Sequence, residues 1–219
     1  MATRINFSPK PFRPDATVSR VIKEDGQIEN TLYYSTSCGL RMEEEASNEA
    51  VFCAAMSGSR ASDAEREESW YRWNTLFSTE ELNAAAETFY PGQIGQILSL
   101  NVLKRLENGR AEVLQVTGTL GTVAIEGEYA IRQFLRPGDQ AVILQDGSTA
   151  PSLGLLPSAF FYITPQYQGG VLSGFLLNGG GYGHGDGMSQ NGAKHLAEEG
   201  WICQEILNRE TIIDRKSVV

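Results

Sequence analysis

The chain has 219 residues, of which 41% are hydrophobic, and a formal net charge of −9 at pH 7. This length is enough for one sizeable core, or for one core with an appended arm. The negative charge and the lack of a basic stripe argue against a nucleic-acid partner, because neutralising phosphates requires clustered Lys and Arg. No apolar run reaches the roughly 18 residues that span a bilayer. The N-terminal stretch MATRINFSPKPFRPD also has no signal-peptide core.

The N-terminal region is expected to have little regular structure. Three prolines within the first 14 residues each fix φ and remove a backbone donor, which predicts an irregular arm over residues 1–17. Residues 17–37 then predict a hairpin. Strand-forming residues lie on both sides of its Asp25-Gly26 turn, and they continue to Tyr34.

Two clusters in the next region each have an ordinary and a functional interpretation. The acidic run at residues 43–45 is more typical of a solvated face than of a catalytic pair. Trp70, Tyr71 and Trp73 favour core or interface packing, and a platform for sugars is the alternative.

Sharper secondary-structure signals begin at residue 78. The segment FSTEELNAAAETF predicts a helix with Ser78 as its N-cap and Glu81 completing a capping box. The apolar period then changes to two around Asn108-Gly109, which predicts a hairpin. A further strand at residues 122–125 follows. After it comes a short helix that starts near residue 128 and buries Ile131, Phe134 and Leu135.

The predicted fold class is α+β, with antiparallel β-hairpins that form a barrel-like sheet and a few short helices. The segments LLPSAFFYITPQ and GVLSGFLLNGGG supply two more strands. There is no internal repeat and no βαβ alternation, which argues against a parallel sheet.

The three cysteines, Cys38, Cys53 and Cys203, are too widely spaced for a compact zinc framework. Free thiols are therefore the preferred interpretation. One disulfide plus one free thiol is the alternative, and the odd number leaves an intermolecular link open.

The stretch NGGGYGHGDGMSQNGAKHLAEEG, residues 178–200, contains both histidines of the chain. Its strand–glycine–helix context is typical of anion binding, but it lacks the dinucleotide and Walker patterns, and Asp186 would repel an anion. A metal held by His184, Asp186 and His195 would need ligands at a spacing that matches no compact motif. We therefore expect neither a cofactor nor a metal.

Glycines alternate with side chains through this stretch. One face of an extended segment would be bare, because Gly181, Gly183, Gly185 and Gly187 lack side chains, and the other face would carry Tyr182, His184, Asp186 and Met188. This pattern favours a shallow surface that binds an extended polar polymer. A tight packing loop is the alternative.

A helix is expected directly after this segment, with Ser189 as its N-cap and Gly200 as its stop. Its inward face would carry Ala193, Leu196 and Ala197. The small residue Gly192 would let the helix approach the sheet closely.

The same stretch resembles the signature of the stage II sporulation protein D / LytB family, approximately G-x-G-x-G-H-G-x-G-M-S-Q-x-G-A. The matching residues are Gly181, Gly183, His184, Gly185, Gly187, Met188, Ser189, Gln190, Gly192 and Ala193. The segments YYSTSCGLRMEEEA, SWYRWNTLFSTEEL and LPSAFFYI are similar to other parts of that family. The resemblance covers about residues 18–208 and leaves 209–219 as a tail.

The resemblance implies an extracytoplasmic protein, in the cell wall or on the outer face of the membrane, whose partner is the glycan strands of peptidoglycan. Its sporulation members are lytic transglycosylases that cleave these strands during engulfment. The family's catalytic glutamate lies in an N-terminal segment that has no counterpart here. The chain is therefore expected to be the C-terminal two-thirds of the domain, with the substrate groove but without the catalytic glutamate. The alternative is a non-catalytic wall-binding module that enhances a cell-wall amidase.

The resemblance also implies the site residues. The expected glycan contacts are Tyr34, Ser35, Ser37, Tyr182, His184, Ser189 and Gln190. The expected structural glycines are Gly181, Gly183, Gly185, Gly187 and Gly192. The family usually has an apolar residue where this chain has Asp186, which makes this carboxylate a weak candidate for a substitute acid.

Overall fold

The computed structural model describes residues 22–24, 27–28, 31–40, 48–58, 63–150, 153–211 and 217–218. The predictions for the N-terminal arm and for the acidic run at residues 43–45 lie outside these ranges. None of the helices in the described part of the chain has the length and apolar content that a bilayer crossing requires.

The described helices are α1 (Glu49–Ser57), the 3-10 helix η3 (Ser69–Tyr71), α2 (Thr79–Phe89), α3 (Glu128–Phe134), α4 (Gln190–Glu198) and α5 (Cys203–Thr211). The strands are β1 (Ile22–Glu24), β2 (Gln27–Ile28), β3 (Tyr33–Tyr34), β4 (Trp73–Ser78), β5 (Ile97–Arg105), β6 (Ala111–Gly118), β7 (Thr122–Glu126), β8 (Val142–Leu144), β9 (Thr149–Ala150), β10 (Phe161–Gln168), β11 (Val171–Gly179), β12 (Met188–Ser189) and β13 (Ser217–Val218).

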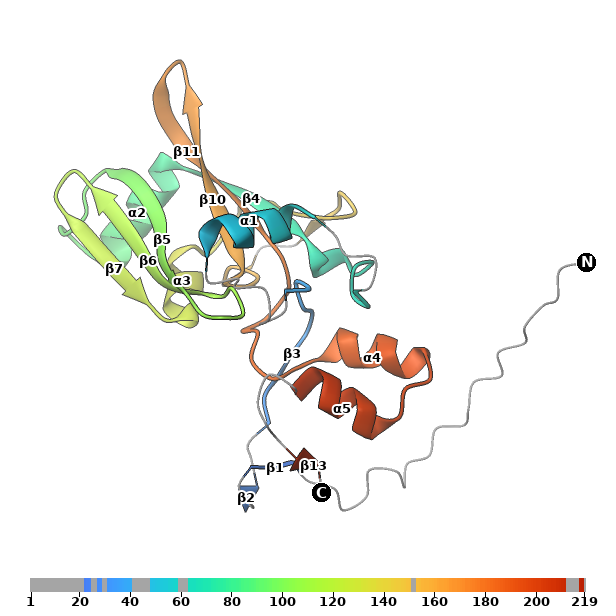
Figure 1. Cartoon of the computed structure of the whole chain (residues 1–219). Coiled ribbons are helices and arrows are strands. Elements are labelled where there is room, and N and C mark those ends of the chain that lie inside the picture. Colours follow the sequence, from blue (N-terminus) through green and yellow to red (C-terminus); the bar gives the residue numbers. More distant parts are fainter. Residues whose placement is uncertain are drawn as a thin grey trace, which may run out of the picture.

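Two antiparallel sheets form the main body (Figure 1). One has the strand order β10-β11-β4-β8-β9, and the other has the order β5-β6-β7. The predicted α+β class, with antiparallel hairpins and short helices, is confirmed, although no sheet among the described residues closes into a barrel. The core lies between the two sheets, α2 and α3, and its largest buried side chains include Phe161, Phe175, Leu114 and Ile131.

The helix α2 forms as its sequence predicts. The Ser78 side chain accepts a hydrogen bond from the Glu81 backbone N–H, and the Glu81 carboxylate accepts one from the Ser78 N–H. Leu82 and Ala86 are buried, because they lie four residues apart on the face that meets the sheet. The capping box thus fixes where β4 ends and α2 begins.

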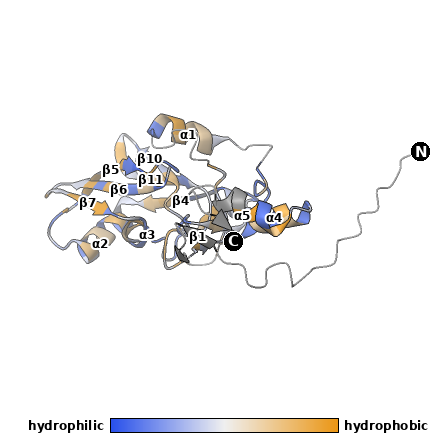
Figure 2. Ribbon diagram, turned by 60° about the horizontal axis from the view of Figure 1, so that its bottom comes forward, coloured by the Kyte–Doolittle hydropathy of each residue, from blue (hydrophilic) through white to orange (hydrophobic). Residues whose placement is uncertain are grey.

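The predicted hairpin around residues 108–109 is also confirmed. β5 and β6 pair antiparallel, and Gly109 has a φ of 87° in the turn between them. Both apolar and polar residues lie along these strands (Figure 2). α3 follows β7 and buries Ile131, Phe134 and Leu135, as its spacing predicts.

The N-terminal hairpin is shorter than predicted. β1 and β2 pair antiparallel across residues 25–26, as the turn signal indicates. Tyr33 and Tyr34 do not continue this hairpin, however. They form β3, which pairs in parallel with β12, at Met188 and Ser189. The sequence argued against a parallel sheet, and this two-stranded parallel pair is the exception to that expectation among the described strands. It joins segments about 155 residues apart in the chain.

The helix after the glycine-rich stretch begins where predicted. The Ser189 side chain accepts a hydrogen bond from the Gly192 N–H at 3.3 Å and caps α4. Gly192 and Leu196 are buried, but Ala197 is exposed, so the predicted inward face is wrong at that residue. α4 and α5 lie side by side, apart from the two main sheets (Figure 1).

All three cysteines are free thiols, as the preferred interpretation of their spacing predicts. Cys38 is buried, and burial raises the pKa of its thiol to about 11. Cys53 and Cys203 are half-buried.

Candidate functional site

The glycine-rich segment packs against residues 32–38. Gly183 has a φ of 123°, and a Cβ there would lie 2.7 Å from Tyr34 Cβ. Gly187 has a φ of 78°, and a Cβ there would overlap the Leu32 carbonyl oxygen. Positive φ values bend the segment away from an extended strand, and the missing side chains admit a second backbone. The glycines therefore build a tight packing loop, and the bare floor expected for a ligand is covered by protein.

Backbone hydrogen bonds join the same two segments. The Ser35 and Thr36 N–H groups both donate to Tyr182 O, at 3.1 and 3.2 Å. The Tyr182 N–H donates back to Thr36 O at 2.9 Å, and the Met188 N–H donates to Leu32 O at 3.1 Å. Side chains at the glycine positions would keep the two backbones apart. The spaced glycines therefore allow these backbone hydrogen bonds to form.

A buried carboxylate links residues 32–38 to the start of α4, the helix that follows the glycine-rich segment. Glu65 Oε1 accepts hydrogen bonds from the Ser37 N–H at 2.9 Å and from Ser189 Oγ at 2.6 Å. Glu65 and Ser189 are both almost completely buried. Sequence reasoning missed Glu65, because it lies in a segment expected to be a loop, among other acidic residues that are exposed or half-buried.

Several of the residues expected to contact a ligand instead direct their polar groups toward other groups of the protein. Ser37 Oγ accepts from the Gly39 N–H at 3.0 Å, and Ser35 Oγ lies 3.3 Å from Thr36 Oγ1. The Tyr34 ring lies 6.1 Å from the ring of His184, centroid to centroid. Gln190 is exposed at the start of α4. The structure thus brings the expected residues close together, mostly as partners of protein groups.

His184 is held by both of its ring nitrogens. Nδ1 accepts from the Asp186 backbone N–H at 3.1 Å, which leaves the ring proton on Nε2 to donate to Tyr33 O at 3.1 Å. The second histidine, His195, has Nε2 2.7 Å from Glu68 Oε1. Among the described residues, no group of three or more His, Cys, Asp or Glu side chains could hold a metal ion.

Asp186 is paired with an arginine from the turn between β5 and β6. Arg110 Nη1 donates to Asp186 Oδ2 at 2.6 Å and to His184 O at 2.9 Å. The Asp186 side chain keeps 42% of its surface exposed, whereas Arg110 keeps 11%. The residue considered as a substitute acid is therefore one half of an ion pair at the rim of the glycine-rich segment.

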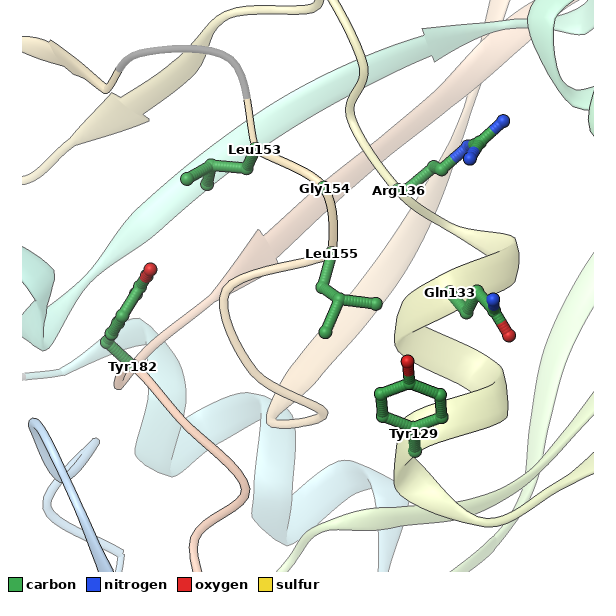
Figure 3. Close-up of a pocket in the computed structure, with 7 residues that line it drawn as sticks. All are labelled: Tyr129, Gln133, Arg136, Leu153, Gly154, Leu155 and Tyr182. Atoms are coloured by element: carbon green, nitrogen blue, oxygen red, sulfur yellow. The ribbon is translucent and has the colours of Figure 1, made fainter.

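A groove lies beside this segment, with a volume of about 380 Å³. Its lining residues are Tyr129, Gln133, Arg136, Leu153, Gly154, Leu155 and Tyr182. In Figure 3 the loop of residues 153–155 runs between Tyr182 on one side and α3 on the other. The side chains of Tyr129 and Gln133 come from the same face of α3, because they lie four residues apart.

The two tyrosines of the groove are supported differently. Tyr182 packs on Trp70, with ring centroids 4.5 Å apart and an interplanar angle of 41°. Tyr129 has 59% of its surface exposed. Of the seven lining residues, only Tyr182 was expected from the sequence, because the exposed face of α3 carries no motif.

The aromatic cluster at residues 70–73 mainly serves packing, as predicted. Tyr71 and Trp73 are almost completely buried, and Trp73 Nε1 donates to Gly181 O at 3.0 Å. Only Trp70 reaches the neighbourhood of the groove, through its contact with Tyr182.

A family model described as "Domain of unknown function (DUF8618)" matches residues 31–187. No model of the stage II sporulation protein D / LytB family matches, so the assignment expected from the glycine-rich signature is wrong. No curated protein matches the chain.

Proposed function

Because this chain belongs to the DUF8618 family, whose function is unknown, we propose from its groove that it binds an extended glycan without cleaving it. The observation that carries the proposal is the groove between α3 and Tyr182, with tyrosine rings on two sides. Peptidoglycan strands are one polymer of this class, and they remain the first to be tested.

Aromatic rings are the first support. The C–H face of a sugar ring is apolar, and it packs on an aromatic side chain that already has a fixed position. Trp70 holds Tyr182 in place, and α3 presents Tyr129 to solvent. The two rings lie on either side of the 153–155 loop, and they offer two stacking surfaces to a chain of sugars that runs across it.

Polar side chains are the second support. Gln133 offers an amide donor and acceptor, and Arg136 offers guanidinium donors, which suit hydroxyl and carbonyl groups. The net charge of −9 disfavours a strongly anionic polymer, because like charges raise the free energy of association. A neutral or weakly charged polysaccharide fits both features.

The lining residues indicate binding rather than cleavage. Glycoside hydrolysis uses a pair of carboxylic side chains that flank the scissile bond. None of the seven residues that line the groove in the described chain carries a carboxylate. Asp186, the nearby candidate, is engaged with Arg110.

Co-sedimentation with purified sacculi and with chitin tests the proposal. The wild-type chain should pellet with at least one polymer, and no soluble sugar fragments should appear. Tyr129→Ala should weaken binding about tenfold, because it removes one stacking surface. Tyr167→Ala is the matched control, since Tyr167 is 65% exposed on β10, outside the groove. A wild-type chain that stays in the supernatant, or equal losses in both variants, would overturn the proposal.

A further inference from the structure

The loop that crosses the groove is held on α3 by one arginine. Arg132 Nε donates to Leu156 O at 2.8 Å, and Nη2 donates to Pro157 O at 3.3 Å. In the other direction, the Leu156 N–H donates to the Arg132 backbone carbonyl at 3.0 Å. The rigid fork of a guanidinium suits two neighbouring oxygen acceptors. Arg132 therefore connects α3 to the residues that directly follow the groove-lining loop at 153–155.

The arginine itself has a fixed position. Its Nη1 forms an ion pair with Glu128 Oε2 at 3.0 Å, one helical turn earlier on α3. The two side chains keep only 11% and 18% of their surface exposed, and neither is one of the seven described residues that line the groove. Each guanidinium nitrogen thus has a protein acceptor. The role of Arg132 is therefore to order the loop, and ligand contacts are left to the residues of the groove.

The same loop is joined to the other side of the groove. The Gly183 N–H donates to Pro157 O at 2.9 Å, so this carbonyl oxygen accepts from Arg132 and also from the residue after Tyr182. On the first side, Tyr129 lies on α3, three residues before Arg132. The contacts that connect the two stacking rings therefore run through the Arg132 side chain and the Pro157 carbonyl.

We propose that Arg132 is a positioning residue of the groove, because it sets the spacing at which Tyr129 and Tyr182 contact the same glycan chain. The proposal rests on the proposed glycan function and adds that the groove selects for chain length. A chain that reaches both rings makes its second contact at a high effective concentration, whereas a short sugar contacts one ring. This gain requires a fixed spacing, since a loosely held loop would spread the distance between the rings over many values.

A role in folding alone predicts a different result. If Arg132 only stabilised the fold, its replacement would lower the melting temperature and leave the affinity of the folded protein unchanged for every ligand. A positioning role instead changes the ratio of the affinities for long and short sugars. This ratio is measured on folded protein, so it separates the two roles.

Calorimetric titration with chito-oligosaccharides of two to six sugars tests the proposal. The affinity of the wild-type chain should rise about tenfold from the shortest to the longest, because the longer sugars add a second stacking contact. Arg132→Gln should bind the disaccharide as the wild type does and lose most of this rise, because its amide cannot donate to both carbonyl oxygens in the arginine geometry. Glu128→Gln is the matched control. It removes the charge of the ion pair, spares both carbonyl contacts and should keep the rise.

Three results would count against the proposal. An undiminished rise in Arg132→Gln, an equal loss of the rise in Glu128→Gln, or a wild-type affinity that is constant along the series would each overturn it and leave the glycan groove intact. No binding at any length would overturn the proposed function and the proposal together.

Thermal unfolding checks that both variants are folded. If Arg132→Gln is not, Arg132→Lys takes its place and should lose part of the rise, because one ammonium group replaces the three nitrogens that bind Glu128 and the two carbonyl oxygens. An undiminished rise in Arg132→Lys would then overturn the proposal.

Discussion

The glycine-rich segment and the groove beside it differ in two respects, namely how clear a motif their sequences carry and how exposed they are to solvent. The segment carries the densest motif of the chain, yet its glycines are covered by residues 32–38 and, at Gly185, by Phe160. The groove is open, and most of its lining comes from α3 and the loop at residues 153–155, where the sequence shows no motif. Closely spaced glycines can therefore mark the approach of two backbones, while the open groove lies on neighbouring elements.

The largest loss of stability should come from filling the glycine face. Gly187→Ala places a Cβ against the Leu32 carbonyl oxygen and also keeps a φ of 78°, so we expect a loss of about 2–5 kcal/mol. Gly147→Ala is the control, because Gly147 has a φ of 80° with open space around its Cβ position, and it should lose only about 1–2 kcal/mol. Urea unfolding measures both. Equal losses would show that residues 32–38 do not cover this face.

The next largest effect should come from the buried carboxylate. Glu65→Ala removes the buried oxygen that accepts from both the Ser37 N–H and the Ser189 hydroxyl, at a cost of about 2–4 kcal/mol. Glu67→Ala removes a side chain that is 80% exposed and should change the free energy of unfolding by less than about 0.5 kcal/mol. If the two variants unfold at the same urea concentration, the Glu65 hydrogen bonds do not stabilise the contact between residues 32–38 and the glycine-rich segment.

A pH-dependent effect of intermediate size should come from Cys38. Burial raises the pKa of its thiol to about 11 from an unfolded value of 9.0, so ionisation favours the unfolded chain between these values. Its stabilising contribution is complete below pH 9 and falls as the pH rises toward 11. The loss at pH 10.5 should be about 2 kcal/mol. Cys38→Ala should remove this part of the alkaline destabilisation, as unfolding curves at pH 8 and 10.5 will show. An identical pH dependence in both proteins would contradict the burial of this thiol.

The smallest effect on folding should come from the open region. Tyr129→Ala should change the free energy of unfolding by less than about 0.5 kcal/mol, because the ring is 59% exposed. A loss above about 2 kcal/mol, measured by urea unfolding, would mean that Tyr129 supports the fold. The groove would then contribute to stability as the glycine-rich segment does.

Much of the fold follows from local patterns. The Ser78–Glu81 capping box, the turn at residues 108–109 and the Ser189 N-cap each lie within a few residues of the structure they determine. The parallel contact of β3 with β12 was not predictable in this way, because two-residue strands so far apart in the chain leave no periodic signal.

The site was harder to predict than the fold. The glycine spacing correctly indicated close approach, but it could not tell a ligand from another backbone. Glu65 and Arg110 acquire their roles from contacts with residues far away in the sequence, at Ser189 and Asp186. Family resemblance based on the glycine signature led to a wrong assignment, while peptidoglycan binding and an amidase partner stay predictions.

An NMR titration of the isotope-labelled chain with chitotetraose, a soluble fragment of chitin, locates the surface that binds the glycan. If the groove binds the glycan, the largest shifts should appear at the amides of Tyr129, Gln133 and Leu155, which line it. The amides of residues 33–38, which the glycine face covers, should change much less. Shifts concentrated at residues 33–38, with the α3 amides unchanged, would contradict the account and return the binding site to the glycine face.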